Sequence, residues 1–161
     1  MKRKGQAAME FLMTYGWAIL VVIAAIAALA YFGVLDPARL LPERCQFPAG
    51  MDCIDKASVD SANSTVTIAL RNNQGFGVTI DNAAISGAYG CVVSGIAVNA
   101  TSQTYNAVPV TVPNNEVFRV RFNTCTFTSG AKFDEQVTLG YTNTESGLAN
   151  QAVGDVRGRV A

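Results

Sequence analysis

The chain has 161 residues, enough for one domain of ordinary size, and 15% of them are charged against a usual ~25%. Lys and Arg together number 12, as do Asp and Glu, so the net charge is zero. The excess of positive charge that is typical of nucleic-acid-binding proteins is therefore missing, and we expect no nucleic-acid partner. Histidine is absent, which excludes Ser-His-Asp and Cys-His catalytic sites and imidazole metal ligation.

The N-terminal segment has a basic start and a long apolar continuation. Lys2, Arg3 and Lys4 precede Gly5, and the stretch 11–35 contains no charged residue. At ~1.5 Å per residue its 25 residues form a helix of roughly 37 Å, longer than the ~30 Å hydrocarbon core of a bilayer. Basic residues before an apolar run keep that end in the cytoplasm and send the rest of the chain outside. The sequence thus predicts a membrane-spanning helix.

Two simpler interpretations of this segment remain open. A cleavable secretory signal has an apolar region of ~7–15 residues, and residues 28–30 imitate its cleavage site, but the hydrophobic stretch continues through Leu35. A plain membrane anchor explains the length but does not require Glu10, a carboxylate at the edge of the apolar run. Glu10 either lies unpaired in the headgroup layer or pairs with a positive group of another copy. Cleavage after Gly5 would create such a group, the α-amine of Gln6.

The motif Gly5-Gln6-Ala7-Ala8-Met9-Glu10-Phe11-Leu12 combines the end of a short basic leader with a Glu four positions after the Gln. It resembles the class III signal peptide of archaeal type IV pilins, and the similarity covers residues 1 to about 36. The resemblance implies that a prepilin peptidase removes residues 1–5 by cutting between Gly5 and Gln6. It also implies that the helix over 6–36 is retained for subunit assembly, in which Gln6, Glu10 and Phe11 take part.

The remainder of the chain has the pattern of an exported β-rich domain. Pro37 ends the helix, and the Pro-containing stretch 37–50 indicates a connector. Beyond it, apolar and polar residues alternate, which is typical of half-buried strands. We expect strands at 64–71, 76–85, 91–98, 107–112, 117–122, 137–141 and 152–160. The predicted fold class is α+β: a long hydrophobic helix followed by an immunoglobulin-like β-sandwich over 51–161.

All four cysteines follow the apolar segment, and an even number in an exported part favours disulfides. Of the three possible pairings we favour Cys45–Cys53, which closes the connector, and Cys91–Cys125, which ties two strands across the domain. A four-cysteine zinc site is the alternative, but the C-x₂-C spacing is missing. We expect no metal and no cofactor.

The exported part also contains two N-glycosylation acceptor patterns, which begin at Asn63 and at Asn99. Each Asn lies at the end of an expected strand, where it should be exposed. Two pairs of acidic residues, 52 with 55 and 134 with 135, are candidate catalytic or Ca²⁺ sites, but solvated loop charges are the simpler interpretation. An enzyme is therefore not expected.

The leading hypothesis is a structural subunit of a pilus-like cell-surface filament, for which the resemblance implies adhesion. Its partners would be copies of itself, the prepilin peptidase, the pilus assembly machinery and, before assembly, the cell membrane. The first alternative is a membrane-anchored extracellular binding module with an uncut helix. The second is a minor pilin or pseudopilin, which the sequence does not separate from a major subunit.

Overall fold

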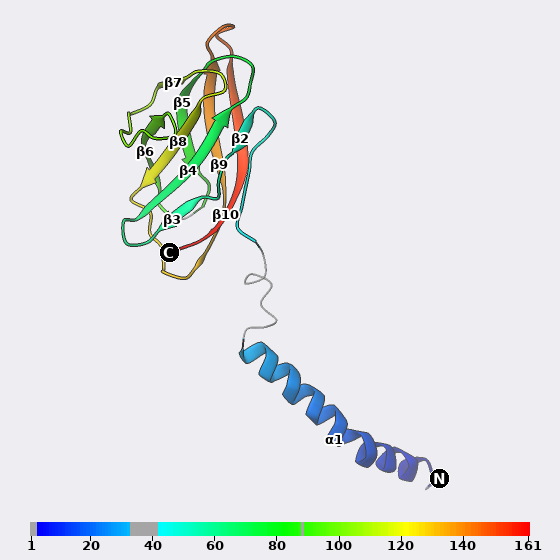
Figure 1. Cartoon of the computed structure of the whole chain (residues 1–161). Helices are drawn as coiled ribbons and strands as arrows, with labels where there is room; N and C mark the ends of the chain where they lie inside the picture. The colour runs from blue at the N-terminus through cyan, green and yellow to red at the C-terminus, as the bar shows by residue number, and fades with distance from the viewer. Residues whose placement is uncertain (1–2, 33–41, 88) are drawn as a thin grey trace. The chain divides into compact units, whose positions relative to one another are not determined.

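The computed structural model describes residues 3–32, 42–87 and 89–161, and the chain divides into two compact units, Met1–Leu41 and Pro42–Ala161. The first unit contains one helix, α1 (Arg3–Tyr31) (Figure 1). Its interior is free of proline and rich in Ala, Leu and Met, which favour helix. Within α1, the 24 residues Ala8–Tyr31 are long and apolar enough to cross a membrane, because they extend over about 36 Å.

The observed helix confirms the predicted apolar helix, with a different start. It begins at Arg3, inside the predicted leader, and not at residue 6. The end of the predicted helix, residues 33–36, lies outside the described residues.

The second unit is a sandwich of two antiparallel sheets, which confirms the predicted fold class (Figure 1). One sheet has the strand order β1-β10-β9-β5-β7, and the other has the order β2-β4-β8-β6 with β3 paired to β4. The strands are β1 (Arg44–Gln46), β2 (Met51–Cys53), β3 (Ser58–Asp60), β4 (Thr65–Asn72), β5 (Val78–Ile85), β6 (Val92–Val98), β7 (Val110–Val112), β8 (Val117–Asn123), β9 (Lys132–Asn143) and β10 (Ala149–Arg159).

The order of the long strands is that of an immunoglobulin sandwich. Strands β4, β8 and β6 take the places of B, E and D in one sheet, and β5, β9 and β10 take those of C, F and G in the other. Strands β2 and β3 together replace strand A, because both pair with β4. Strands β7 and β1 are additional edge strands beside β5 and β10.

Alternation along the strands builds the core between the two sheets. In β8, Phe118, Val120 and Phe122 are fully buried, whereas Arg119 and Arg121 lie on the outer face. Strands β4 and β10 alternate in the same way, and the inward side chains of both sheets form one hydrophobic cluster. The β-domain therefore buries its own apolar faces without help from α1.

The domain begins earlier than the sequence predicts. Strand β1 lies inside the stretch 37–50 that was assigned to a connector, and the compact unit starts at Pro42 and not at residue 51. Strands β1, β2 and β3 have three residues each, too few for a recognisable period of two. Pairing with β10 and β4, and not local pattern, makes them strands.

The two disulfides join the cysteines in the pairing that the sequence favours, Cys45–Cys53 and Cys91–Cys125. Cys45 lies in β1 of one sheet and Cys53 in β2 of the other, so this bond joins the two sheets. Cys91 precedes β6 and Cys125 follows β8, which are neighbours in one sheet. The second bond therefore joins the ends of two adjacent strands of one sheet. The prediction that it ties two strands across the domain is wrong.

Asn72 is a fully buried polar residue at the end of β4. Its Nδ2 donates hydrogen bonds to the carbonyl oxygens of Phe76, Val112 and Pro113 at 2.9, 3.3 and 3.1 Å. Its Oδ1 accepts a hydrogen bond from the main-chain N–H of Gln74 at 3.1 Å. One side chain thus fixes the turn after β4 and ties it to the end of β7 in the opposite sheet.

Removing this side chain should destabilise the domain strongly. We expect Asn72→Ala to lower the free energy of unfolding by about 3 kcal/mol, because buried carbonyl groups lose their donor. The exposed neighbour Asn73 is the control, and Asn73→Ala should change it by less than about 0.5 kcal/mol. Denaturant unfolding of the detergent-solubilised chain measures both values. Equal effects of the two substitutions would contradict the assigned role of Asn72.

Candidate functional site

The candidate assembly residues all lie in the first part of α1. The backbones of Gly5 and Gln6 belong to the helix, while the side chain of Gln6 is outside what the structure describes. Glu10 and Phe11 are exposed, and 60% of the Phe11 surface is accessible. Cleavage after Gly5 and the pairing of Glu10 with the Gln6 amine therefore stay predictions.

Local contacts shape this end of the helix. The Thr14 hydroxyl donates a hydrogen bond to the carbonyl oxygen of Glu10 at 2.8 Å, one turn earlier. The rings of Phe11 and Tyr15, also one turn apart, have centroids 4.6 Å from each other. Both contacts leave the Glu10 carboxylate at the surface of the helix.

The middle of α1 is apolar in every direction. Residues 19–23 are Ile, Leu, Val, Val and Ile, and their exposed fractions are 56, 68, 53, 56 and 61%. Because an α-helix has ~3.6 residues per turn, five consecutive residues point around its whole circumference. No side of this segment is suited to water, and a helix of this kind has to be buried all round.

The two predicted glycan acceptors are both exposed, but their amide groups differ. Asn99 follows β6 with a positive φ of 82°, and its Oδ1 accepts hydrogen bonds from the N–H and the hydroxyl of Thr101 at 3.2 and 3.3 Å. Its Nδ2, the atom that would carry a glycan, has no acceptor in the part of the chain that the structure describes.

Asn63 is held by a neighbouring carboxylate. Its Nδ2 donates to Oδ2 of Asp60 at 2.6 Å, and its main-chain N–H donates to Oδ1 at 3.1 Å. The side-chain hydrogen bond from Asn63, followed by the main-chain one, lowers the pKa of Asp60 below its usual value. The ionised Asp60 carboxylate thus occupies the Asn63 amide.

The structure does not assemble the acidic residues of the sequence into catalytic pairs. Asp134 binds Arg157 and Lys132, whereas the adjacent Glu135 accepts a hydrogen bond from the Ser86 hydroxyl at 3.0 Å. Burial raises the pKa of Asp134, but hydrogen bonds from Arg157 and Lys132 outweigh it and hold the pKa below its usual value. Asp134 is therefore an ion-pair partner and not an acid poised near neutral pH.

The remaining candidates are accounted for in the same way. Asp52 accepts a hydrogen bond from Asn73 at 2.5 Å, and Asp55 accepts one from the main-chain N–H of Lys56 at 2.8 Å. All four cysteines are in disulfides, which overturns the alternative of a zinc site. Over residues 3–32, 42–87 and 89–161, no group of three or more Cys, Asp or Glu side chains is placed to hold a metal ion.

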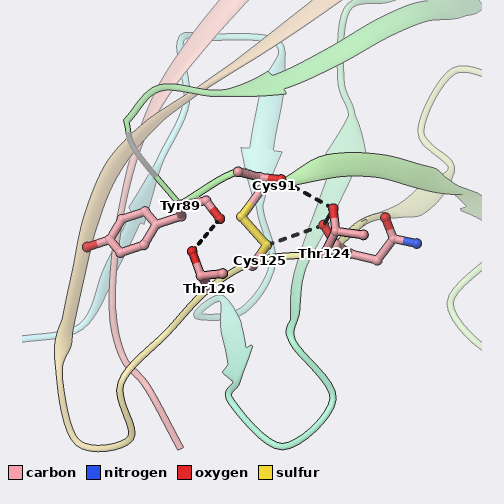
Figure 2. Close-up of a disulfide and its surroundings, with 7 residues drawn as sticks. Tyr89, Cys91, Thr124, Cys125 and Thr126 are labelled. Carbon is pink, nitrogen blue, oxygen red and sulfur yellow. Dashed lines mark hydrogen bonds between the residues drawn. A yellow bond between two sulfur atoms is a disulfide. The ribbon is translucent and has the colours of Figure 1, made fainter.

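The disulfide Cys91–Cys125 has polar neighbours on both chain segments (Figure 2). The Thr126 hydroxyl donates to the carbonyl oxygen of Tyr89 at 3.1 Å, and the Thr124 hydroxyl donates to that of Gly90 at 3.2 Å. These hydrogen bonds continue the β6–β8 pairing past the strand ends. The polar groups around the disulfide therefore hold the two chain segments together.

No protein-family model matches this chain, and no curated protein matches it. Its function therefore has to be argued from its own residues.

The difference between the two acceptor asparagines is testable. If the chain is glycosylated, we expect Asn99 to be occupied severalfold more than Asn63, because the Asp60 carboxylate competes for the Asn63 amide. Asp60→Ala should raise the occupancy of Asn63, and Asn99→Gln should remove most of the glycan. Glycopeptide mass spectrometry of protein recovered from its own cells measures each occupancy. Occupancies that are equal, and unchanged in Asp60→Ala, would contradict this prediction.

Proposed function

We propose that this protein is a structural subunit of an archaeal type IV pilus-like filament, which polymerises through α1 and presents its β-domain on the filament surface. The observation that carries the proposal is an all-round apolar helix that follows directly on the Gly5-Gln6 and Glu10 pattern. The precursor lies in the cell membrane, and the assembled subunit lies in an extracellular filament used for adhesion. No enzymatic activity is part of this proposal.

The described residues of the β-domain present no continuous apolar surface that could surround α1. The β-domain has a closed core, and its exposed large apolar side chains, Ile54, Val92, Leu148 and Val153, are spread over separate elements. A single partner helix would cover only one side of residues 19–23. Lipid covers all sides, and so does a bundle of identical helices, where each contact gains ~25 cal/mol per Å² of buried apolar surface.

The small side chains of α1 support the second kind of cover. Ala24, Ala25, Ala27, Ala28 and Ala30 follow the bulky stretch, and small residues allow helices to approach closely. A contact between two different faces of the same subunit repeats without closing, which produces a helical filament. The chain thus has a helix that suits the membrane before assembly and the filament core after it.

Glu10 supports a filament over a plain anchor. An anchor needs only apolar length, and a carboxylate at the edge of the span brings it no benefit. In a filament core, the α-amine of a processed Gln6 would pair with Glu10 of a neighbouring copy. An unpaired carboxylate in that apolar environment is strongly unfavourable, so the pair selects one axial position for each incoming subunit.

Processing is the first prediction of this proposal. Intact-mass measurement of the protein recovered from cells should show a chain that starts at Gln6. Gly5→Val should leave the leader attached, because the peptidase requires a small residue there. A native chain that starts at Met1 would favour the membrane-anchored binding module instead, and a start after Ala30 would leave a secreted β-domain without a helix.

Assembly is the second prediction. Glu10→Ala should be exported and processed but should yield at least about tenfold less filament, the ratio that a loss of ~1.4 kcal/mol in docking energy produces. Glu145→Ala, which removes an exposed carboxylate at the β9–β10 turn, is the control and should assemble normally. Electron microscopy and quantification of sheared filaments measure the yield. Normal filaments from Glu10→Ala would refute the role of Glu10 in register.

A further inference from the structure

The outer face of the β1-β10-β9 sheet places like charges opposite each other. Arg44 of β1 is the cross-strand partner of Arg157 of β10, and Arg159 of β10 is the partner of Lys132 of β9. These four residues form what we call the basic patch. Like charges directly opposite in a sheet are destabilising, so two such pairs side by side need a physical reason.

Neutralisation within the domain is incomplete. Asp134 is the carboxylate inside the basic patch, and it binds Arg157 Nε at 2.8 Å and Lys132 Nζ at 3.4 Å. Arg44 and Arg159 remain exposed on either side. Asp134 is the one carboxylate among the four residues' cross-strand partners, and Glu43, which also feels the charge of Arg159, is shared with Lys56.

The carboxylates around the basic patch are already engaged. Glu43 forms an ion pair with Lys56 at 2.7 Å. The hydrogen bond from Lys56 and its charge lower the pKa of Glu43 most, and the main chain and the charge of Arg159 lower it further. Asp155, two residues before Arg157, accepts a hydrogen bond from Gln136 at 3.3 Å. The basic patch and Lys56 together carry five positive charges against three negative charges, those of Asp134, Glu43 and Asp155, so an excess of two positive charges remains.

The chain restricts which anions the basic patch meets. Strand β1 begins two residues after Pro42, and only the nine residues 33–41 separate the β-domain from the end of the described apolar segment. Nine residues extend at most about 32 Å even when fully stretched. While α1 lies in a bilayer, β1 is thus tethered near the lipid headgroups on the outer side. Lipids whose headgroups carry a net negative charge present an anionic surface at that range.

We propose that the basic patch binds the anionic headgroups of the membrane that holds α1, and so docks the β-domain on the outer membrane face before assembly. This inference rests on insertion of α1 in a membrane and not on polymerisation. A second copy is the competing partner that the experiment below separates from the membrane; three of its carboxylates, Asp60, Asp81 and Asp134, already accept hydrogen bonds from their own domain.

A tryptophan reporter tests the docking in the full chain. The single tryptophan, Trp17, is replaced in Trp17→Phe, and Gln46→Trp places a reporter on exposed β1 beside the basic patch. The chain is placed at one copy per nanodisc that contains headgroup spin-labelled lipid. We expect quenching in phosphatidylglycerol discs, little in phosphatidylcholine discs, and recovery at about 0.5 M NaCl, where charges are screened within ~4 Å. Thr65→Trp, on the other sheet, should be quenched in neither.

Charge variants then assign the effect to the basic patch. Arg44→Gln with Arg159→Gln should lower the ratio of docked to free domain roughly 25-fold, about fivefold for each charge near an anionic surface. Arg44→Lys with Arg159→Lys should retain docking. Arg71→Gln with Arg121→Gln removes the same charge from the other sheet and should change nothing. A far-ultraviolet spectrum checks that every variant is folded.

Two results would overturn the inference. The first is quenching that is equal in the two lipids or that survives loss of Arg44 and Arg159. The second is absence of quenching in one-copy phosphatidylglycerol discs together with quenching in discs prepared with two copies, which would identify the patch as a contact between subunits. Because docking is measured in discs that hold one copy, the outcome is independent of filament assembly. Failure of the filament proposal would leave this result unchanged as long as α1 spans the bilayer.

Discussion

The apolar surface of α1 is the constraint on which the rest of this molecule depends. Residues 19–23 point apolar side chains around the full circumference, and over residues 42–87 and 89–161 the exposed large apolar side chains are spread over separate elements. In water the apolar side chains of α1 would therefore be exposed, although each of the two units forms regular secondary structure. Lipid and copies of the same helix are the two environments that would bury all sides of α1.

The β-domain is built so that it does not depend on either environment. The disulfide Cys45–Cys53 joins the two sheets, Cys91–Cys125 fixes neighbouring strand ends, and Asn72 ties the end of β4 to the opposite sheet. Crosslinks reduce the entropy of the unfolded chain, which stabilises a small domain by itself. If α1 moves from lipid into a filament core, as we propose, the β-domain therefore stays folded in both environments.

The sequence predicts those parts of this structure that local pattern controls. The apolar helix and the seven strands β4 to β10 follow from length and alternation, and the cysteine pairs follow from their number and position. Strands β1 to β3 are not predicted from the sequence, because their pairing depends on residues that are distant in the chain. Arg44, for example, lies opposite Arg157. The same limit hides the basic patch, which brings residues 44, 132, 157 and 159 together only through sheet register. Of the candidate site residues, Glu10 and Phe11 are located on α1. The partner that we propose for Glu10 belongs to another copy of the chain.

Lipid and a bundle of identical helices both require a helix that is apolar on all sides. Glu10 is therefore the residue that distinguishes these two environments. Any all-round apolar helix is stable in lipid and in a bundle, so hydrophobicity alone does not choose between anchor and filament. A choice requires a group that the bilayer edge tolerates and that a bundle accepts only when it is paired. Glu10 stands at the boundary of the apolar run, where headgroup water reaches it in the membrane but would not reach it in a filament core. In the proposed filament, release from lipid would be favourable only in the register that pairs Glu10, so assembly and correct alignment would be the same event.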